Sequence, residues 1–220
     1  MTKWSALWQK PICYKVDLAL AIDDCILILE EFQNIPNPSL ILDIDGTSLK
    51  QIGGRSLNSR PISPVKLLYQ TALRLGYQVF FVTARPAQYK DERGRTRDNA
   101  EETIAELAKL GYTQFSGIFF RTEQYLRDDK YDHYKLQCRR RVENEHQCRI
   151  VLNIGDNWED MTPITDPPPR KNFRETLSPG QIRCLSFIRA LPTKLERNQA
   201  IYLWHYPDSH SLFSLKLPQE

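Results

Sequence analysis

Hydrophobic positions occur in two kinds of run, long runs typical of helices and short runs typical of buried strands. Residues 16–32 are apolar around most of the helical circumference and contain neither Gly nor Pro, which predicts a buried helix. Residues 39–43 form a short apolar run that stops at an acidic residue, as buried parallel strands do at their carboxyl ends. The pattern therefore predicts a helix followed by a buried strand.

The later runs repeat this alternation of strand and helix. Gly76 and Gly111 each follow a predicted helix, and Ser63 and Pro64 are expected to be the N-cap and the first residue of another. The predicted helices are residues 63–75, 98–110, 131–143 and 179–189; the predicted strands are residues 77–82, 117–121, 149–154 and 200–204, with residues 211–217 as a last edge strand and residues 166–170 as a surface loop.

Strands that alternate with helices at this spacing predict right-handed crossovers. The expected fold class is α/β, a three-layer, doubly wound and mainly parallel sheet. We expect residues 1–38 to form an N-terminal helical extension that packs on a core of residues 39–220.

Composition limits the class of protein. The chain has 220 residues, enough for one α/β domain. Hydrophobic residues make up 41%, charged residues 26%, and the mean hydropathy is -0.50, which argues against a disordered chain and a membrane bundle. The formal net charge of +3 is too small to indicate nucleic-acid binding by itself.

The cysteines and the first residues indicate a compartment. The five cysteines are scattered without a CxxC pair, so we expect reduced thiols. Residues 1–15 lack the apolar core of a signal peptide. We therefore expect a cytoplasmic protein that makes no contact with a membrane. The sequence carries no signal for oligomeric state.

Polar residues gather at the carboxyl ends of three predicted strands, where ligands bind in open α/β sheets. The three segments are Asp43-Ile44-Asp45-Gly46-Thr47, Thr83-Ala84-Arg85 and Gly155-Asp156-Asn157, with Asp160 one helical turn beyond Asp156. Carboxylates, a hydroxyl and tight glycine turns are thus expected to meet at one edge of the sheet.

The segments ILDIDGT, FFVTAR and GDNWED, with a lysine in the helix before the strand at 149–154, resemble the four ordered motifs of the haloacid dehalogenase (HAD) superfamily of phosphohydrolases. The resemblance covers residues 40–160, and the ordered set is far more specific than a lone DxD. It implies a Rossmann-like core and Mg²⁺-dependent hydrolysis of a phosphate monoester.

A phosphate monoester is anionic and resists attack, so its hydrolysis needs a nucleophile, a cation and a proton donor. Asp43 can attack as a carboxylate and form an aspartyl phosphate. Asp45, two residues on and so on the same side of a strand's pleat, is placed to act as general acid and base. A dehalogenase is disfavoured, because those enzymes lack this second aspartate.

An all-oxygen Mg²⁺ site is expected from the carboxylates of Asp43 and Asp156, with the backbone carbonyl of Asp45 as the resemblance implies. The other expected site residues are Thr83 and Lys135 as catalytic groups that contact the phosphoryl group, Gly46, Thr47, Ala84 and Arg85 around the substrate, and Asn157 and Asp160 behind the metal and the lysine.

Several of these residues have a purely structural alternative. Asp43 and Asp45 could cap a strand, Asp156 could be a helix N-cap, and Thr83 could satisfy only backbone groups. Lys135 has basic neighbours that could take its place, namely Arg121, Lys130, Arg139, Arg140 and Arg141. A helix of mixed charge is more often a solvated face than a site.

Cap domains in this superfamily follow motif one or motif two, and neither gap is long enough to hold one. The layout resembles class B acid phosphatases and plant vegetative storage proteins, which usually carry an acidic residue at the position of Gly46. We therefore expect an acid-phosphatase-like enzyme acting on a phosphorylated small molecule or a nucleotide.

Two alternatives remain open. Residues 76–85 and 93–97 resemble a bacteriophage polynucleotide 3'-phosphatase, and the basic stretch 166–197 could follow a nucleic-acid backbone. The second alternative is a non-catalytic binding or storage protein, against which the presence of both Asp43 and Asp45 argues.

Overall fold

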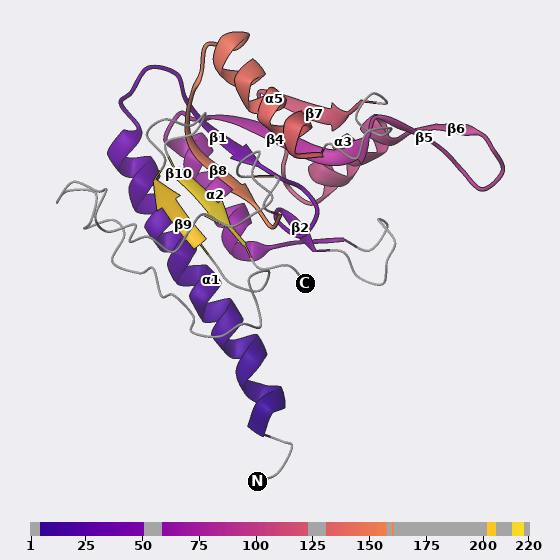
Figure 1. Cartoon of the computed structure of the whole chain (residues 1–220). Helices are drawn as coiled ribbons and strands as arrows, with labels where there is room; N and C mark the ends of the chain where they lie inside the picture. The colour runs from indigo at the N-terminus through magenta and orange to yellow at the C-terminus, as the bar shows by residue number, and fades with distance from the viewer. Residues whose placement is uncertain are drawn as a thin grey trace.

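The computed structural model describes residues 5–50, 59–122, 131–157, 160, 202–205 and 213–217. Its centre is a six-stranded sheet in the order β7-β4-β1-β8-β10-β9 (Figure 1). Five strands are parallel, and β9 (Tyr202–His205) is antiparallel to its neighbour. The parallel strands are β1 (Pro38–Leu42), β4 (Gln78–Pro86), β7 (Gly117–Arg121), β8 (Arg149–Gly155) and β10 (Phe213–Lys216).

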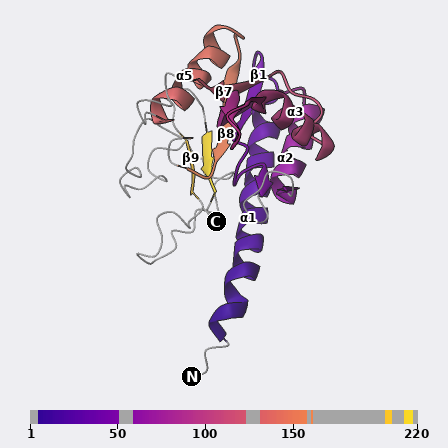
Figure 2. The same ribbon diagram turned by 90° about the vertical axis from the view of Figure 1, so that its right-hand side faces the viewer.

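Helices cover both faces of this sheet, which gives the predicted three layers. The helices α1 (Ser5–Phe32), α2 (Ser63–Arg74) and α3 (Asn99–Lys109) lie on one face, and α5 (Tyr131–Asn144) lies on the other (Figure 2). The expected fold class is therefore confirmed. Within the described residues, no helix combines the length and hydrophobicity needed to cross a bilayer.

Alternation along the central strands divides the core into two hydrophobic clusters. Leu40 and Leu42 of β1 pack in the larger cluster, with the residues of α1, α2 and α3. Ile41, between them, packs in the smaller cluster with residues of α5 such as Val142. Both faces of the strand are buried, which is why its sequence is a continuous apolar run instead of an alternating one.

The carboxyl-terminal strands differ from the prediction. Residues 211–217 were expected to form an edge strand, but β10 lies inside the sheet, parallel to β8 and antiparallel to β9, which is the edge. The edge prediction is wrong because β9 pairs with the outer side of β10; within the sheet, Phe213, Leu215 and Leu217 are all buried. Phe213 also packs edge-on against Phe32 of α1.

Two helix beginnings differ as well. The helix α1 begins at Ser5 and continues through Pro11, although proline in a helix interior is unfavourable and the prediction began only at residue 16. The N-cap of α2 is Ile62, and Ser63 is already helical, so the predicted cap was one residue late. Pro64 is therefore the second helical residue and not the first, although it still lies in the first turn. The predicted helix at 179–189 and loop at 166–170 lie outside the described residues.

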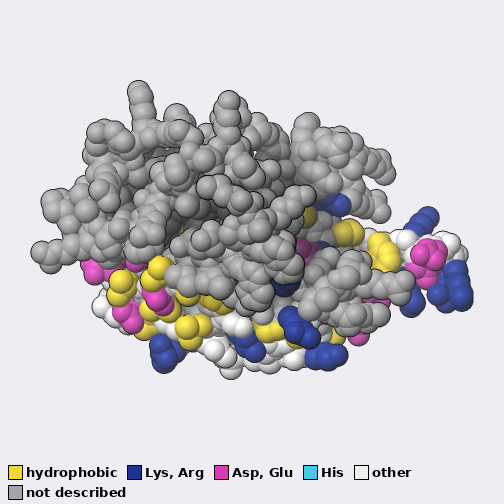
Figure 3. Space-filling view, turned by 90° about the horizontal axis from the view of Figure 1, so that it is seen from below, with side chains coloured by type: hydrophobic (Ala, Val, Ile, Leu, Met, Phe, Trp, Pro, Cys, Tyr) yellow, Lys and Arg dark blue, Asp and Glu magenta, His cyan; other side chains and the backbone are white. Residues whose placement is uncertain are grey.

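Two short hairpins were not predicted. The strands β2 (Leu49–Lys50) and β3 (Arg60–Pro61) follow β1 in the chain and pair with each other. The strands β5 (Gln88–Lys90) and β6 (Thr96–Asp98) follow β4 and also pair. Every residue of β5 and β6 is exposed. Their sequences therefore lack the alternation of apolar and polar residues from which a strand is predicted. Basic side chains gather at this end of the molecule (Figure 3).

The larger cluster offers a test of the core. Phe81 of β4 is fully buried, and its ring meets those of Tyr112 and Phe115 edge-on, with centroids 5.7 and 5.5 Å away. Phe81→Ala should lower the free energy of unfolding, measured by urea denaturation, by about 3–5 kcal/mol. Leu27→Ala, at a position 48% exposed, should change it by less than about 0.5 kcal/mol. Equal losses would place Phe81 outside the core.

Candidate functional site

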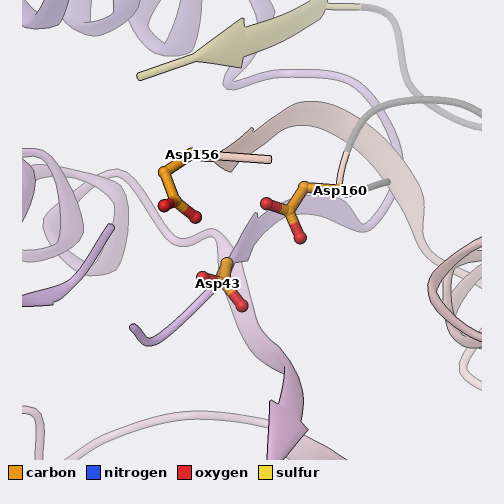
Figure 4. Close-up of side chains that lie close together, drawn as sticks. All are labelled: Asp43, Asp156 and Asp160. Carbon is orange, nitrogen blue, oxygen red and sulfur yellow. The ribbon is translucent and has the colours of Figure 1, made fainter. Parts of the chain in front are cut away.

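Three aspartates from two strand ends converge beyond the central sheet. Asp43 follows β1, and Asp156 and Asp160 follow β8 (Figure 4). All three are buried, and one carboxylate oxygen of each lies within 4.8 Å of the others. Their meeting is a direct result of strand order, because β1 and β8 are parallel neighbours whose carboxyl ends share an edge.

The turn after β1 is held by its own backbone and by Ser48. The Asp43 N–H donates to the Ile154 carbonyl at 2.9 Å, which continues the pairing of β1 with β8. The Ser48 hydroxyl donates to the Asp43 carbonyl at 2.6 Å, and the Gly46 N–H donates to the Leu49 carbonyl at 2.9 Å. Asp43, the candidate nucleophile, therefore lies in a turn that several hydrogen bonds hold in place.

Two glycines make room for the aspartates after β8. Gly46 has a φ of +75°, and a Cβ there would stand 2.5 Å from Asp156 Oδ2. At Gly155 a Cβ would collide with the side chain of Asp160. Gly46 thus meets both a conformational and a steric demand, which explains its place in the DIDGT segment.

Lys135 lies between two of the carboxylates. Its side chain is 4% exposed, and its ammonium donates to Asp43 Oδ1 at 2.9 Å and to Asp160 Oδ1. Of the basic neighbours weighed as alternatives, Arg139 donates to the backbone carbonyl of Asp160, and Arg141 pairs with Glu145 at the surface. The structure brings Lys135 to the aspartates.

Asp160 is fixed by further hydrogen bonds. Asn153 Nδ2 donates to the Asp160 carbonyl at 2.6 Å, and the Asn157 N–H donates to Asp160 Oδ2 at 2.8 Å. The Asn157 side chain in turn donates to Asp156 Oδ1 at 2.8 Å. Asn157 therefore links the two aspartates that follow β8, in line with a supporting role. Asn153 was not singled out from the sequence, where it is one polar residue inside an apolar strand.

Burial and neighbouring charges shift the pKa values of the groups in this cluster. Burial raises the pKa of Asp43 well above its ordinary value, and Asp160 and Asp156 add to the rise, whereas Lys135 opposes it. Burial alone would lower the pKa of Lys135, but Asp160 and Asp43 raise it above its ordinary range. Burial lowers the pKa of Arg139 to about 10.

The donor set of the cluster suits a small divalent cation. Of the three buried carboxylates, those of Asp43 and Asp160 contact the Lys135 ammonium, and carboxylate oxygens are the ligands that Mg²⁺ prefers. A buried carboxylate without a compensating charge is costly, so a cation would offset the burial and the repulsion from Asp160 and Asp156 that together raise the pKa of Asp43. The residues present therefore fit a divalent metal.

Asp45 takes part in a second, separate set of charges. Arg85 donates to both of its carboxylate oxygens, and the same guanidinium donates to Glu106 and Thr103 of α3. Glu106 and Thr103 were not predicted as site residues. The available signal was their spacing, which places two polar side chains on the same helix face as the buried Leu107.

The remaining predicted residues lie in the same turns. Thr83 is fully buried, and its hydroxyl accepts from the Arg85 N–H at 3.1 Å. Thr47 is also fully buried, and its hydroxyl has no hydrogen-bond partner among the described residues. Ala84 is half-buried at the end of β4. Among the described residues, Thr47 therefore keeps an unpaired donor next to Gly46.

A comparison with protein families matches residues 54–175 to the model of the HAD superfamily, subfamily IIIB (acid phosphatase). The matched span contains Thr83, Arg85, Lys135 and the segment after β8, and it begins after the turn that carries Asp43 and Asp45. A search of curated proteins finds no match.

The contact between Gly46 and Asp156 can be tested with a matched glycine. Gly46 and Gly94 have φ angles of +75° and +72°, but a Cβ at Gly94 would meet no atom within 4 Å. Gly94→Ala should lower the free energy of unfolding by about 1 kcal/mol, the cost of the left-handed conformation. Gly46→Ala should cost more, and it should also weaken any stabilisation by a divalent cation, because the new methyl group would displace Asp156.

Both variants should be measured by thermal denaturation with and without Mg²⁺. Equal losses of stability for the two alanines, with an unchanged effect of Mg²⁺, would show that the contact does not shape the site.

Proposed function

The chain belongs to subfamily IIIB of the HAD superfamily, the acid phosphatases, and is a phosphoric monoester hydrolase; we propose that it acts through an aspartyl-phosphate intermediate on Asp43. The supporting observation is the position of the Asp43 carboxylate. It is buried, held by Lys135 at 2.9 Å, and lies within 4.8 Å of two further carboxylates.

The proposed reaction has two steps. In the first, an oxygen of Asp43 attacks phosphorus, the bond from phosphorus to the leaving oxygen breaks, and Asp45 gives its proton to that oxygen. In the second, a water molecule attacks phosphorus and passes a proton to Asp45 while the bond from phosphorus to Asp43 breaks. Both aspartates then return to their starting states, and inorganic phosphate leaves.

The metal is proposed as Mg²⁺, held by the carboxylates of Asp43 and Asp156 and by the backbone carbonyl of Asp45. When bound, it neutralises charge on the phosphoryl oxygens. Asn157 holds the two aspartates that follow β8, since its side chain donates to Asp156 and its backbone N–H donates to Asp160.

Other side chains contact the phosphoryl group in this proposal. Lys135 offsets the charge on Asp43 and the phosphoryl oxygens. The hydroxyls of Thr47 and Thr83 and the backbone N–H groups near Gly46 and Ala84 donate to those oxygens. Thr47 fits this role because its buried hydroxyl lacks a partner among the described residues.

We propose a phosphorylated small molecule or a nucleotide as substrate. The described chain between Thr47 and β4 contains only the β2–β3 hairpin and α2, and from Arg85 to Lys135 only the β5–β6 hairpin, α3 and β7. These connections leave the leaving-group side of the site open in the proposal. The polynucleotide alternative depends in part on the basic residues 166–197, which lie outside the described residues.

The metal and substrate assignments are tested by activity. Purified protein with p-nitrophenyl phosphate should release phosphate in Mg²⁺, lose that activity in EDTA, and regain it when Mg²⁺ is added back. A panel of nucleotides, sugar phosphates and 3'-phosphorylated oligonucleotides should then favour the small molecules. Activity that survives exhaustive chelation would refute the metal assignment, and a preference for oligonucleotides that falls steeply with salt would favour the polynucleotide alternative.

Two isosteric variants separate the roles of the aspartates. Asp43→Asn should abolish turnover of every substrate, because an amide does not attack phosphorus. Asp45→Asn should lower kcat by about 10²–10⁴-fold on an alkyl phosphate, and by less on p-nitrophenyl phosphate, whose leaving group needs no proton. The far-UV circular dichroism spectrum and a single cooperative thermal transition serve as the control for folding, because loss of the Asp43 charge beside Lys135 changes the melting temperature itself. Near wild-type turnover by Asp43→Asn would refute the nucleophile, and equal losses on both substrates would refute the acid.

A further inference from the structure

The Arg85 guanidinium connects the turn after β1 to the helix α3. Its Nε and Nη2 donate to Asp45 Oδ2 and Oδ1 at 2.8 and 2.7 Å. Its Nη1 donates to Glu106 Oε2 at 2.7 Å and to Thr103 Oγ1 at 3.2 Å. Four of the five N–H groups of an arginine are thereby used within the protein.

The contact with Asp45 has the two-pronged form that fixes a carboxylate in one plane. A carboxylate has about four lone-pair sites, and the fork occupies one on each oxygen. The side chain of Asp45 is 35% exposed and that of Arg85 is 11% exposed, so the carboxylate faces outward with the arginine behind it.

Among the described residues, the only charged group that contacts the Glu106 carboxylate is Arg85. The side chain of Glu106 is 13% exposed, and its second oxygen is buried without a hydrogen-bond partner in the part of the chain that the structure describes. Burial of a carboxylate is costly unless a positive charge accompanies it. Arg85 supplies that charge, so Glu106 and Arg85 stabilise each other in this position.

The helix that carries Glu106 is firmly attached to the end of β4. Asp98 caps α3 by accepting from the Glu101 N–H at 3.0 Å. Asn99 Nδ2 donates to the Pro86 carbonyl at 2.7 Å, and the Ala100 N–H donates to the Ala87 carbonyl at 3.0 Å. Arg85 is thus held from behind by a rigid element.

The balance of charge argues against Arg85 as a phosphate ligand. One guanidinium faces two carboxylates, those of Asp45 and Glu106, so this group carries no surplus positive charge. Lys135, by contrast, contacts the carboxylate of the proposed nucleophile directly. The expectation that Arg85 binds substrate therefore finds less support in the contacts than a role toward Asp45.

We propose that Arg85 is a positioning residue that holds the acid and base Asp45 in its working orientation, and that Glu106 and Thr103 anchor Arg85 for this purpose. The proposal rests on the proposed role of Asp45. Misplacement of a reacting group by about 1 Å can cost 10²-fold in rate, so loss of the fork should act on the step that moves the proton.

The experiment combines Arg85→Gln, Asp45→Asn and the double variant, each assayed with glycerol 2-phosphate and p-nitrophenyl phosphate. Arg85→Gln should lower kcat on glycerol 2-phosphate by about 10²-fold, lower it less on p-nitrophenyl phosphate, and leave KM nearly unchanged. In the Asp45→Asn background the same change should have no further effect on kcat, because nothing remains to be positioned.

Milder variants keep the test valid if Arg85→Gln folds poorly. Arg85→Lys keeps the charge but lacks the fork, and it should show the same dependence on the leaving group. Glu106→Gln keeps an acceptor for Nη1 and should retain most of the activity. Arg141→Gln is the matched control, since it removes an exposed pair with Glu145 and should leave both substrates unaffected. Melting temperatures are compared throughout.

Each other result overturns the proposal in its own way. A rise in KM with kcat unchanged would make Arg85 a substrate ligand. A full further loss in the Asp45→Asn background would mean that Arg85 acts independently of Asp45. If Asp45→Asn itself shows no dependence on the leaving group, the acid role fails first, and the role of Arg85 fails with it.

Discussion

The buried contact of Lys135 with Asp43 and Asp160 is the interaction on which the rest of the site depends. An ammonium and two carboxylates, each nearly inaccessible to solvent, would be unstable alone, and removal of one partner from a buried ion pair typically costs about 3–5 kcal/mol. The cluster therefore requires all its members together. It also requires α5 to pack on the sheet in the position that lets Lys135 reach Asp43 at the end of β1.

That requirement explains several features away from the aspartates. Arg139, one turn along α5 from Lys135, donates to the Asp160 backbone, and Asn153 donates to the same carbonyl from β8. These bonds fix the turn after β8 from two sides. The glycines at 46 and 155 then leave space for carboxylates where any side chain would collide with them. The ion pairs of Lys135 hold the carboxylates in place, and the two glycines leave the space that these carboxylates occupy.

The sequence predicted the parts of this structure that follow from local rules. Asp43 and Asp156 could be assigned to one edge because apolar runs ending in acidic residues mark the carboxyl ends of parallel strands. The contacts of Arg85 with Thr103 and Glu106 could not be predicted, because the spacing of these two residues shows only that they share a helix face. The interior place of β10 depends on long-range pairing with β8, and the exposed β5–β6 hairpin carries no apolar pattern.

The two proposed catalytic aspartates receive their support from opposite faces of the sheet. Asp43 meets Lys135 of α5, on the face of the smaller hydrophobic cluster, and Asp45 is connected through Arg85 to α3, on the face of the larger one. The two helices pack in separate hydrophobic clusters, so each of the two aspartates is supported by its own layer of the fold.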